Sequence, residues 1–151
     1  MKIISKNPNG PDALLLMDEL SNELESITGN SGKSSFNLDD VCVPRSLFVV
    51  AYAENEEPVG CGAIRPISEN IAEVKRMYAK TRGLGVGTEI LHSLEMQAQK
   101  LGYSTLWLET RLINKQAVLF YEKNGYHRIP NYGKYIDNFE AVCFEKNIYR
   151  F

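Results

Sequence analysis

The sequence predicts a single α/β domain over residues 1–151, with a mixed, mainly antiparallel central sheet flanked by helices. Two observations lead to this fold class. The patterns along the chain run in the order strand, helix, three strands, helix, strand, helix, strands, and no linker or repeat interrupts them. A chain of 151 residues, 44% of them hydrophobic, is also long enough for one compact domain with a sizeable core.

The N-terminal quarter predicts a short strand over residues 1–5 and then an amphipathic helix that opens at Pro11. Apolar residues recur there at helical spacing, with acidic residues between them. The predicted buried face consists of Leu14, Leu15, Met17, Leu20, Leu24 and Ile27. A polar, glycine-containing loop over residues 29–35 ends this segment.

Three strands are predicted next, over residues 46–52, 59–65 and 71–79. Short polar turns separate them, so neighbouring strands should pair antiparallel. A helix then runs from the glycine-rich turn to about Leu101, and Gly102 caps its end.

The C-terminal third predicts a strand over residues 104–110 and a short helix that begins at Asn114. Asn124-Gly125 is a typical helix stop. Two final strands are expected over residues 126–129 and 140–146.

The composition excludes several classes of function. A net charge of −2 and a pI near 5.7 argue against nucleic acid as the main partner, which needs a basic surface. No apolar run is long enough to span a bilayer, and the N-terminus lacks a signal-peptide core. Cys42, Cys61 and Cys143 are too widely spaced for a zinc site or a disulfide framework. We therefore expect no metal, buried cysteines and a cytoplasmic protein.

The most informative segment is the turn between the strand of residues 71–79 and the following helix, which reads Arg82-Gly83-Leu84-Gly85-Val86-Gly87. Glycines allow backbone N–H groups to approach a ligand closely. The first turn of a helix adds unpaired N–H donors and the positive end of its dipole. The segment therefore predicts a site for a phosphate or pyrophosphate.

Three phosphate-binding patterns compete for this turn. A Walker loop needs a lysine after its glycine, but Thr88 follows Gly87 directly. The Gly-x-Gly-x-x-Gly spacing of dinucleotide-binding turns is also absent. The pattern Arg/Gln-x-x-Gly-x-Gly/Ala is matched by Arg82, Gly85 and Gly87, and it resembles the pyrophosphate-binding pattern of the GNAT acetyltransferase superfamily, which uses acetyl-CoA.

A second motif strengthens the resemblance about 30 residues further on. The family pattern Asn-x-x-Ala-x-x-x-Tyr-x-x-x-Gly-Tyr/Phe is matched by Asn114, Ala117, Tyr121, Gly125 and Tyr126. The strands over residues 59–65 and 71–79 are also similar to the family's third and fourth strands. The resemblance covers nearly the whole chain, and it departs from the family in one place: the connection before Arg82 looks about two residues short.

The resemblance implies a direct transfer of an acetyl group from acetyl-CoA to a primary amine of a small molecule or a protein. It assigns the CoA pyrophosphate to backbone N–H groups of the turn, Gly83, Leu84, Gly85, Val86, Gly87 and Thr88. Arg82 should add positive charge, and the backbone of Met77 and Ala79 should pair with the pantetheine arm. Asn114 should cap its helix and also contact that arm.

For the chemistry, the resemblance assigns to Tyr121 the donation of a proton to the departing thiolate. Glu73 is the candidate base for the amine, and Glu109 on the next strand is its rival. His92 and His127 are expected to be structural. The aromatic-rich segment 132–139 is expected to wall the acceptor pocket.

Two other functions compete with this one. A non-catalytic acyl-CoA-binding regulatory module would keep the binding motifs without turnover. A nucleotide-dependent transferase is disfavoured because the turn lacks a lysine. The sequence leaves open the identity of the acceptor amine and the oligomeric state, with a homodimer among the options.

Overall fold

The computed structural model describes residues 1–33 and 36–148, so Ser34 and Ser35 of the expected polar loop lie outside the described residues. The strands are β1 (Lys2–Ser5), β2 (Leu47–Tyr52), β3 (Pro58–Pro66), β4 (Ile71–Ala79), β5 (Thr105–Arg111), β6 (His127–Ile129) and β7 (Ala141–Asn147). The helices are α1 (Pro11–Thr28), α2 (Val86–Lys100) and α3 (Lys115–Lys123), with short 3-10 turns η2 (Leu38–Val41) and η3 (Gly133–Tyr135). Each predicted strand is present, and its ends lie within one residue of the prediction.

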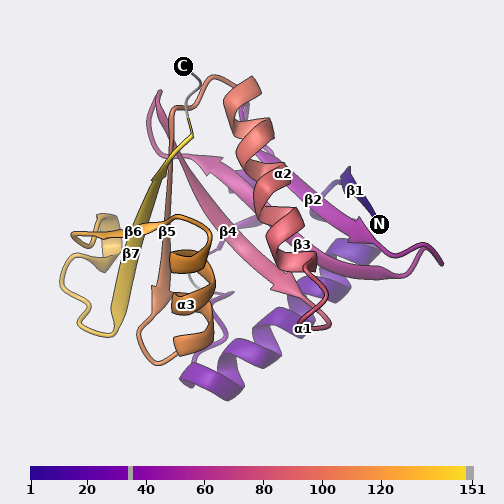
Figure 1. The fold of residues 1–151 in the computed structure, drawn as a ribbon, viewed down its shortest axis with the longest axis horizontal. Helices are drawn as coiled ribbons and strands as arrows, with labels where there is room; N and C mark the ends of the chain where they lie inside the picture. Colours follow the sequence, from indigo (N-terminus) through magenta and orange to yellow (C-terminus); the bar gives the residue numbers. More distant parts are fainter. Residues whose placement is uncertain (34–35, 149–151) are drawn as a thin grey trace.

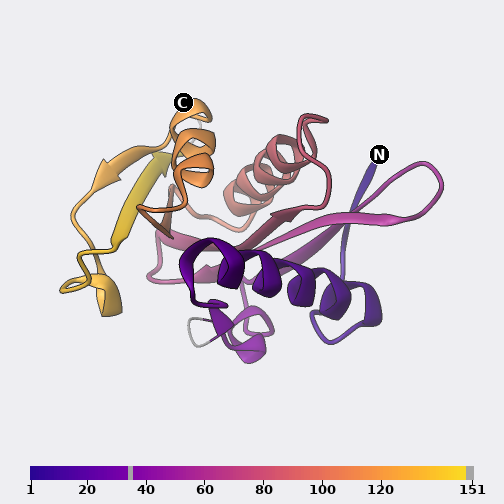
Figure 2. The same cartoon turned by 90° about the horizontal axis from the view of Figure 1, so that it is seen from below.

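The strands form one sheet in the order β1-β2-β3-β4-β5-β7-β6, and all pairs are antiparallel except β4 with β5. Helix α1 covers one face, and α2 and α3 lie on the other (Figures 1 and 2). The predicted fold class, a mixed and mainly antiparallel sheet flanked by helices, is confirmed.

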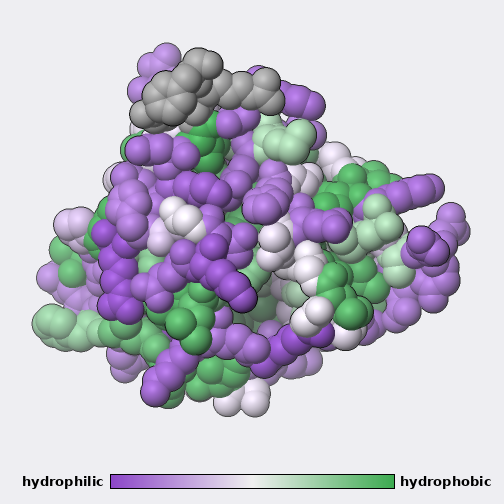
Figure 3. All heavy atoms as spheres, in the orientation of Figure 1, coloured by the Kyte–Doolittle hydropathy of each residue, from purple (hydrophilic) through white to green (hydrophobic). Residues whose placement is uncertain are grey.

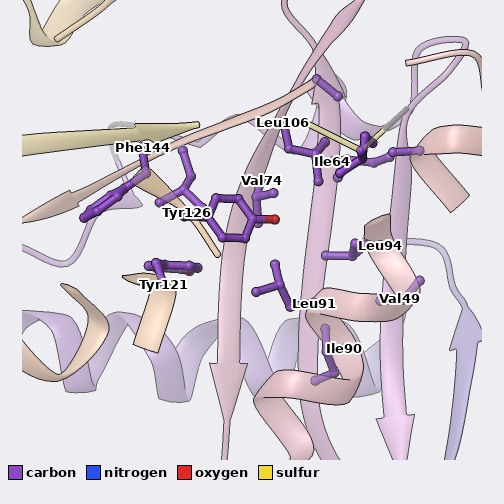
Figure 4. Close-up of a cluster of buried hydrophobic side chains, with 14 of the residues drawn as sticks. Val49, Ile64, Val74, Ile90, Leu91, Leu94, Leu106, Tyr121, Tyr126 and Phe144 are labelled. Atoms are coloured by element: carbon purple, nitrogen blue, oxygen red, sulfur yellow. The ribbon is translucent and has the colours of Figure 1, made fainter. Parts of the chain in front are cut away.

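The larger core lies between the sheet and the face formed by α2 and α3 (Figure 4). Ile90, Leu91 and Leu94 of α2 are fully buried. Gly62 of β3 permits the close packing, because a Cβ atom there would lie 2.9 Å from Ile90 and 3.0 Å from Leu94. A second core cluster joins α1 to the opposite face of the sheet.

Two predictions of burial were wrong. Leu14 and Leu15 of α1 are 46% and 48% exposed, while Ala13 and Leu16 are buried. The run of leucines here is apolar on every side, so it does not fix the rotation of the helix, whereas packing against β3 and β4 does. Cys42, expected to be buried, is exposed just after η2.

The sheet opens between its two parallel strands. β4 and β5 pair only over Ile71–Thr105, Ala72–Leu106 and Glu73–Trp107, although β4 continues to Ala79 and β5 to Arg111. Beyond these pairs the strands diverge, with α3 beside the gap (Figure 1). Among the described residues, the divergence leaves one edge of β4 without a strand partner from Val74 onward.

A β-bulge lies in the same part of β4. Arg76 and Met77 together oppose Gly62, and Arg76 adopts a positive φ of 54°. The Arg76 guanidinium is turned toward α1, where Nη2 donates to the Met17 carbonyl at 2.9 Å and to the Ser21 hydroxyl at 2.6 Å. These two hydrogen bonds hold the bulge against α1 at the point where β4 and β5 diverge.

Candidate active site

The opening between β4 and β5 holds a cavity of about 810 Å³. Its wall comes from β4, β5, the first turn of α2, α3, α1, and the residues Asn30, Gly32 and Phe36. Apolar surface gathers on this side of the molecule near α3 and near the turn before α2 (Figure 3), where Leu119 and Leu84 are exposed. A cavity of this size with mixed polar and apolar walls is typical of a small-molecule site.

The glycine-rich turn leads directly into α2 at the mouth of the cavity. Gly85 is the helix N-cap with φ 75°, a left-handed conformation that strongly favours glycine. Within the described residues, the amides of Val86, Gly87 and Thr88 have no hydrogen-bond acceptor. The expected group of free N–H donors at a helix start is therefore present despite the short connection, and its chemistry fits a phosphate group.

The open edge of β4 faces the same cavity. Lys80 N–H donates to the Val59 carbonyl at 2.8 Å, so the backbone of Lys80 faces β3. Backbone groups alternate along a strand, which directs those of Ala79 and Met77 to the edge that lacks a strand partner. These two residues can accept an extended ligand as an added strand.

Arg82 and Asn114 both line the cavity. The Arg82 side chain is 58% exposed and pairs with Glu23 of α1 at 3.1 Å, so its charge is shared between that carboxylate and any ligand. The Asn114 side chain accepts a hydrogen bond from Ala117 N at 3.3 Å. The predicted helix cap at Asn114 is confirmed.

Tyr121 of α3 forms part of the inner cavity wall. Its ring is 8% exposed and packs near Tyr126 and Phe144 (Figure 4). Its hydroxyl has no hydrogen-bond partner among the described residues. Burial, with a smaller effect of Glu109, raises the pKa of Tyr121, so the phenol stays protonated at neutral pH and can donate.

Glu73 lies outside the cavity wall. It is 3% exposed, and both carboxylate oxygens are engaged. Arg65 Nη1 lies 2.9 Å from Oε1, and the Tyr132 hydroxyl donates to Oε2 at 2.5 Å. The structure therefore places Glu73 and Tyr121, the two predicted catalytic residues, in different surroundings.

Glu109 of β5 lies in the cavity wall with Tyr121. Its Oε2 is 3.3 Å from Arg111 Nη1 but accepts no hydrogen bond within the described part of the chain. Burial raises the pKa of Glu109, and the positive charges of Arg111 and Lys75 oppose the shift without cancelling it. A carboxylate with a raised pKa beside a cavity is suited to accept a proton near neutral pH.

Sequence reasoning missed several charged residues of the wall, and two of them matter for the chemistry. Lys75 of β4 and Arg111 of β5 both line the cavity. Lys75 lies in the middle of β4 and Arg111 at the end of β5, and only the divergence of these two strands brings both residues to one cavity, so the sequence carries no local signal for them. Burial lowers the pKa of Lys75.

The expectation that segment 132–139 walls the acceptor pocket is wrong, because none of its residues lines the cavity. Leu84, His92 and His127 also lie outside the cavity wall. His92 is exposed on α2, and His127 is exposed and lies 3.4 Å from Glu145. In the part of the chain that the structure describes, no group of His, Cys, Asp or Glu could hold a metal ion. No helix among the described residues is long and apolar enough to cross a membrane.

Comparisons with known proteins agree with this geometry. The model of the acetyltransferase (GNAT) family matches residues 16–126. The chain is 29% identical over 147 residues to an IAA acetyltransferase of Azospirillum brasilense, covering 95% of each protein. A crystal structure from Klebsiella pneumoniae with the provisional name acyl-CoA N-acyltransferase covers 97% of both chains at 26% identity and a TM-score of 0.82. A GNAT family acetyltransferase of Elizabethkingia anophelis with acetyl-CoA bound shares the fold, at a TM-score of 0.71, 16% identity and 97% coverage of both chains.

Proposed function

This chain belongs to the GNAT acetyltransferase family, and from that premise we propose that it moves an acetyl group from acetyl-CoA directly to a primary amine. One observation carries the proposal. A single cavity joins the free amides that open α2, the open edge of β4, the Tyr121 hydroxyl and the Glu109 carboxylate. A phosphate site, a strand edge, an acid and a base are the four parts that this transfer needs.

The binding of acetyl-CoA is assigned to the wall of the cavity formed by α2 and β4. The amides of Val86, Gly87 and Thr88 suit the pyrophosphate, and Arg82 adds a guanidinium at the mouth. The edge of β4 at Met77 and Ala79 suits the amide groups of the pantetheine arm. With this assignment the thioester end points toward the divergence of β4 and β5.

The acid and the base follow from the two buried groups of the inner wall. The amine must lose a proton to attack the thioester carbonyl, and Glu109 is assigned this proton. The new N–C bond forms as the C–S bond breaks, and the sulfur leaves as a thiolate. Tyr121 is assigned the proton donation to that thiolate, because burial keeps its phenol protonated.

Glu73 was the first candidate for the base, and it stays a competing proposal. Its position between Arg65 and Tyr132 favours a structural role, since each carboxylate oxygen already has a partner and the residue lies outside the cavity wall. Glu109 is preferred because it lies in the wall of the cavity beside Tyr121.

The test has two steps. Calorimetry with acetyl-CoA should detect binding, and a panel of primary amines should then release free thiol from acetyl-CoA in the presence of the protein. Binding with no thiol release from any amine would instead favour a non-catalytic acyl-CoA-binding module. No heat with acetyl-CoA would overturn both functions.

A further inference from the structure

Lys75 lines the cavity without an ion-pair partner among the described residues, and Lys134 lies near the same aromatic ring as Lys75. Lys75 Nζ lies 6.0 Å from the centroid of the Tyr135 ring, and Lys134 Nζ lies 5.7 Å from the same centroid. The Lys75 ammonium also donates to the Tyr135 hydroxyl at 3.3 Å. Among the described residues, no carboxylate oxygen forms an ion pair with either ammonium group, although Arg65 and Arg111 both have one.

An arrangement of this kind is costly unless an anion joins it. Lys75 is half-buried, and two like charges share one aromatic ring. Buried charges in proteins are normally paired, because desolvation of an unpaired ion is unfavourable. The carboxylates of Glu73 and Asp40 pair with Arg65, and Glu109 Oε2 lies 3.3 Å from Arg111. No carboxylate among the described residues forms an ion pair with Lys75, so an anionic group of a ligand can take that place.

The same cavity presents an acceptor of opposite sign. Glu109 Oε2 is buried and accepts no hydrogen bond from any described residue. Lys75 and Glu109 line one cavity together. The charge of Glu109 acts to raise the pKa of Lys75, and the charge of Lys75 acts to lower the pKa of Glu109. A ligand that carries both an ammonium and a carboxylate group would satisfy both sites at once.

The segment from α1 adds an apolar wall on this side of the cavity. Leu24, Ile27 and Phe36 all line it, and none of them carries a polar side-chain atom. These residues suit the body of a ligand that is charged at one end and apolar at the other.

We propose that the acetyl acceptor is a free amino acid with an apolar side chain, held by its carboxylate at Lys75 while its amino group meets Glu109. This inference rests on the proposed acetyl transfer and names the substrate class of that same site. Lys134 adds a second positive charge on the carboxylate side. The carboxylate itself takes no part in the chemistry, since the amine forms the new bond and the thiolate leaves.

The test compares each amino acid with its amide, which keeps the amine and the side chain but removes the negative charge. We expect the wild-type kcat/KM for leucine and phenylalanine to exceed that for leucinamide and phenylalaninamide by about tenfold or more. The substitution Lys75→Met should bring this ratio close to one. The matched control Lys100→Met, on the exposed end of α2, should preserve the ratio.

The outcomes separate this inference from the acetyl transfer itself. If amides react as well as amino acids, the acceptor is not recognised by a carboxylate, and the inference is wrong while the activity stands. If no amine releases thiol, calorimetry of leucine with the CoA-loaded protein decides. Binding that weakens about tenfold in Lys75→Met, or in Lys134→Met where the first variant fails to fold, supports the inference, and no heat in the wild type overturns it.

Discussion

The hydroxyl of Tyr132 donates a 2.5 Å hydrogen bond to Oε2 of Glu73, which ties the loop after β6 to the middle of β4. Arg65 holds the other carboxylate oxygen at 2.9 Å, and the Trp107 ring packs on Tyr132 with centroids 4.8 Å apart. Burial and the Glu73 carboxylate raise the pKa of Tyr132, so its hydroxyl remains a donor. These contacts are consistent with a structural role for Glu73, in which its carboxylate bridges Arg65 and Tyr132.

A first prediction separates Glu73 from the base. Tyr132→Phe leaves Oε2 of Glu73 buried without its donor and should cost about 2 kcal/mol of unfolding free energy. The Tm should fall by roughly 4–8 °C for a domain of this size. Glu73→Gln should lower the Tm similarly and keep kcat within about tenfold of the wild type. A drop in kcat of about a hundredfold in Glu73→Gln at unchanged Tm would return the role of base to Glu73.

The second prediction concerns pH. A base works only when deprotonated, so a Glu109 carboxyl with a raised pKa should place the rising limb of the kcat/KM profile above the usual range for a carboxyl group. Glu109→Gln should lower kcat by about a hundredfold and remove that limb. The measurement is thiol release from about pH 4 to about pH 9 with one amine. A rising limb that survives in Glu109→Gln would assign the proton to another group.

The raised pKa of Glu109 also sets the direction of a stability effect. The folded protein keeps this proton to a higher pH than the unfolded chain, so unfolding releases it between the ordinary and the raised pKa. The stability of the wild type relative to Glu109→Gln should therefore fall as pH rises through that window. Urea unfolding of both proteins at a series of pH values measures the difference.

A third prediction tests the acid. Tyr121→Phe should lower kcat by about a hundredfold and leave the Kd for acetyl-CoA nearly unchanged, because the hydroxyl has no partner among the described residues. Tyr103→Phe is the matched control, since Tyr103 is also buried but its hydroxyl donates to the Arg45 carbonyl at 2.7 Å, away from the cavity wall. That variant should lose stability and keep kcat. Equal kcat in Tyr121→Phe and the wild type would exclude the phenol from the reaction.

The elements of the fold could be predicted because their signals are local. Gly102, with φ 94°, follows α2 where the sequence placed its end, and Asn114 caps α3 through Ala117 three positions along the chain. The rotation of α1 could not be predicted, because Leu14 and Leu16 are identical residues and only the sheet distinguishes them.

The residues of the candidate site also fall into two groups: those that a local motif predicts and those that depend on residues far away in the sequence. The glycine-rich turn and Tyr121 belong to contiguous motifs, so their membership of one cavity followed from the resemblance. The choice between Glu73 and Glu109 depends on Tyr132, which lies 59 positions from Glu73. The pair of lysines at Tyr135 joins β4 to η3 and has no local signature either.

The fourth prediction tests the turn that opens α2. Gly85 has φ 75°, and a Cβ atom at this position would meet no other atom within 4 Å, so Gly85→Ala adds backbone strain without a steric clash. The strain should cost about 1–2 kcal/mol or be relieved by a shift of the turn. Either response displaces the amides of Val86, Gly87 and Thr88, so the Kd for acetyl-CoA should rise about tenfold in calorimetry.

Gly102→Ala distinguishes lost ligand contacts from general strain. Gly102 has φ 94° at the opposite end of α2, and a Cβ there would make only an ordinary contact of 3.5 Å with Arg45. Both variants should lose similar amounts of stability in urea, because both force alanine into the left-handed region. Only Gly85→Ala should weaken acetyl-CoA binding, since only its strain acts on the free amides of the first turn. Equal weakening in both variants would mean that the phosphate groups are not held at the start of α2.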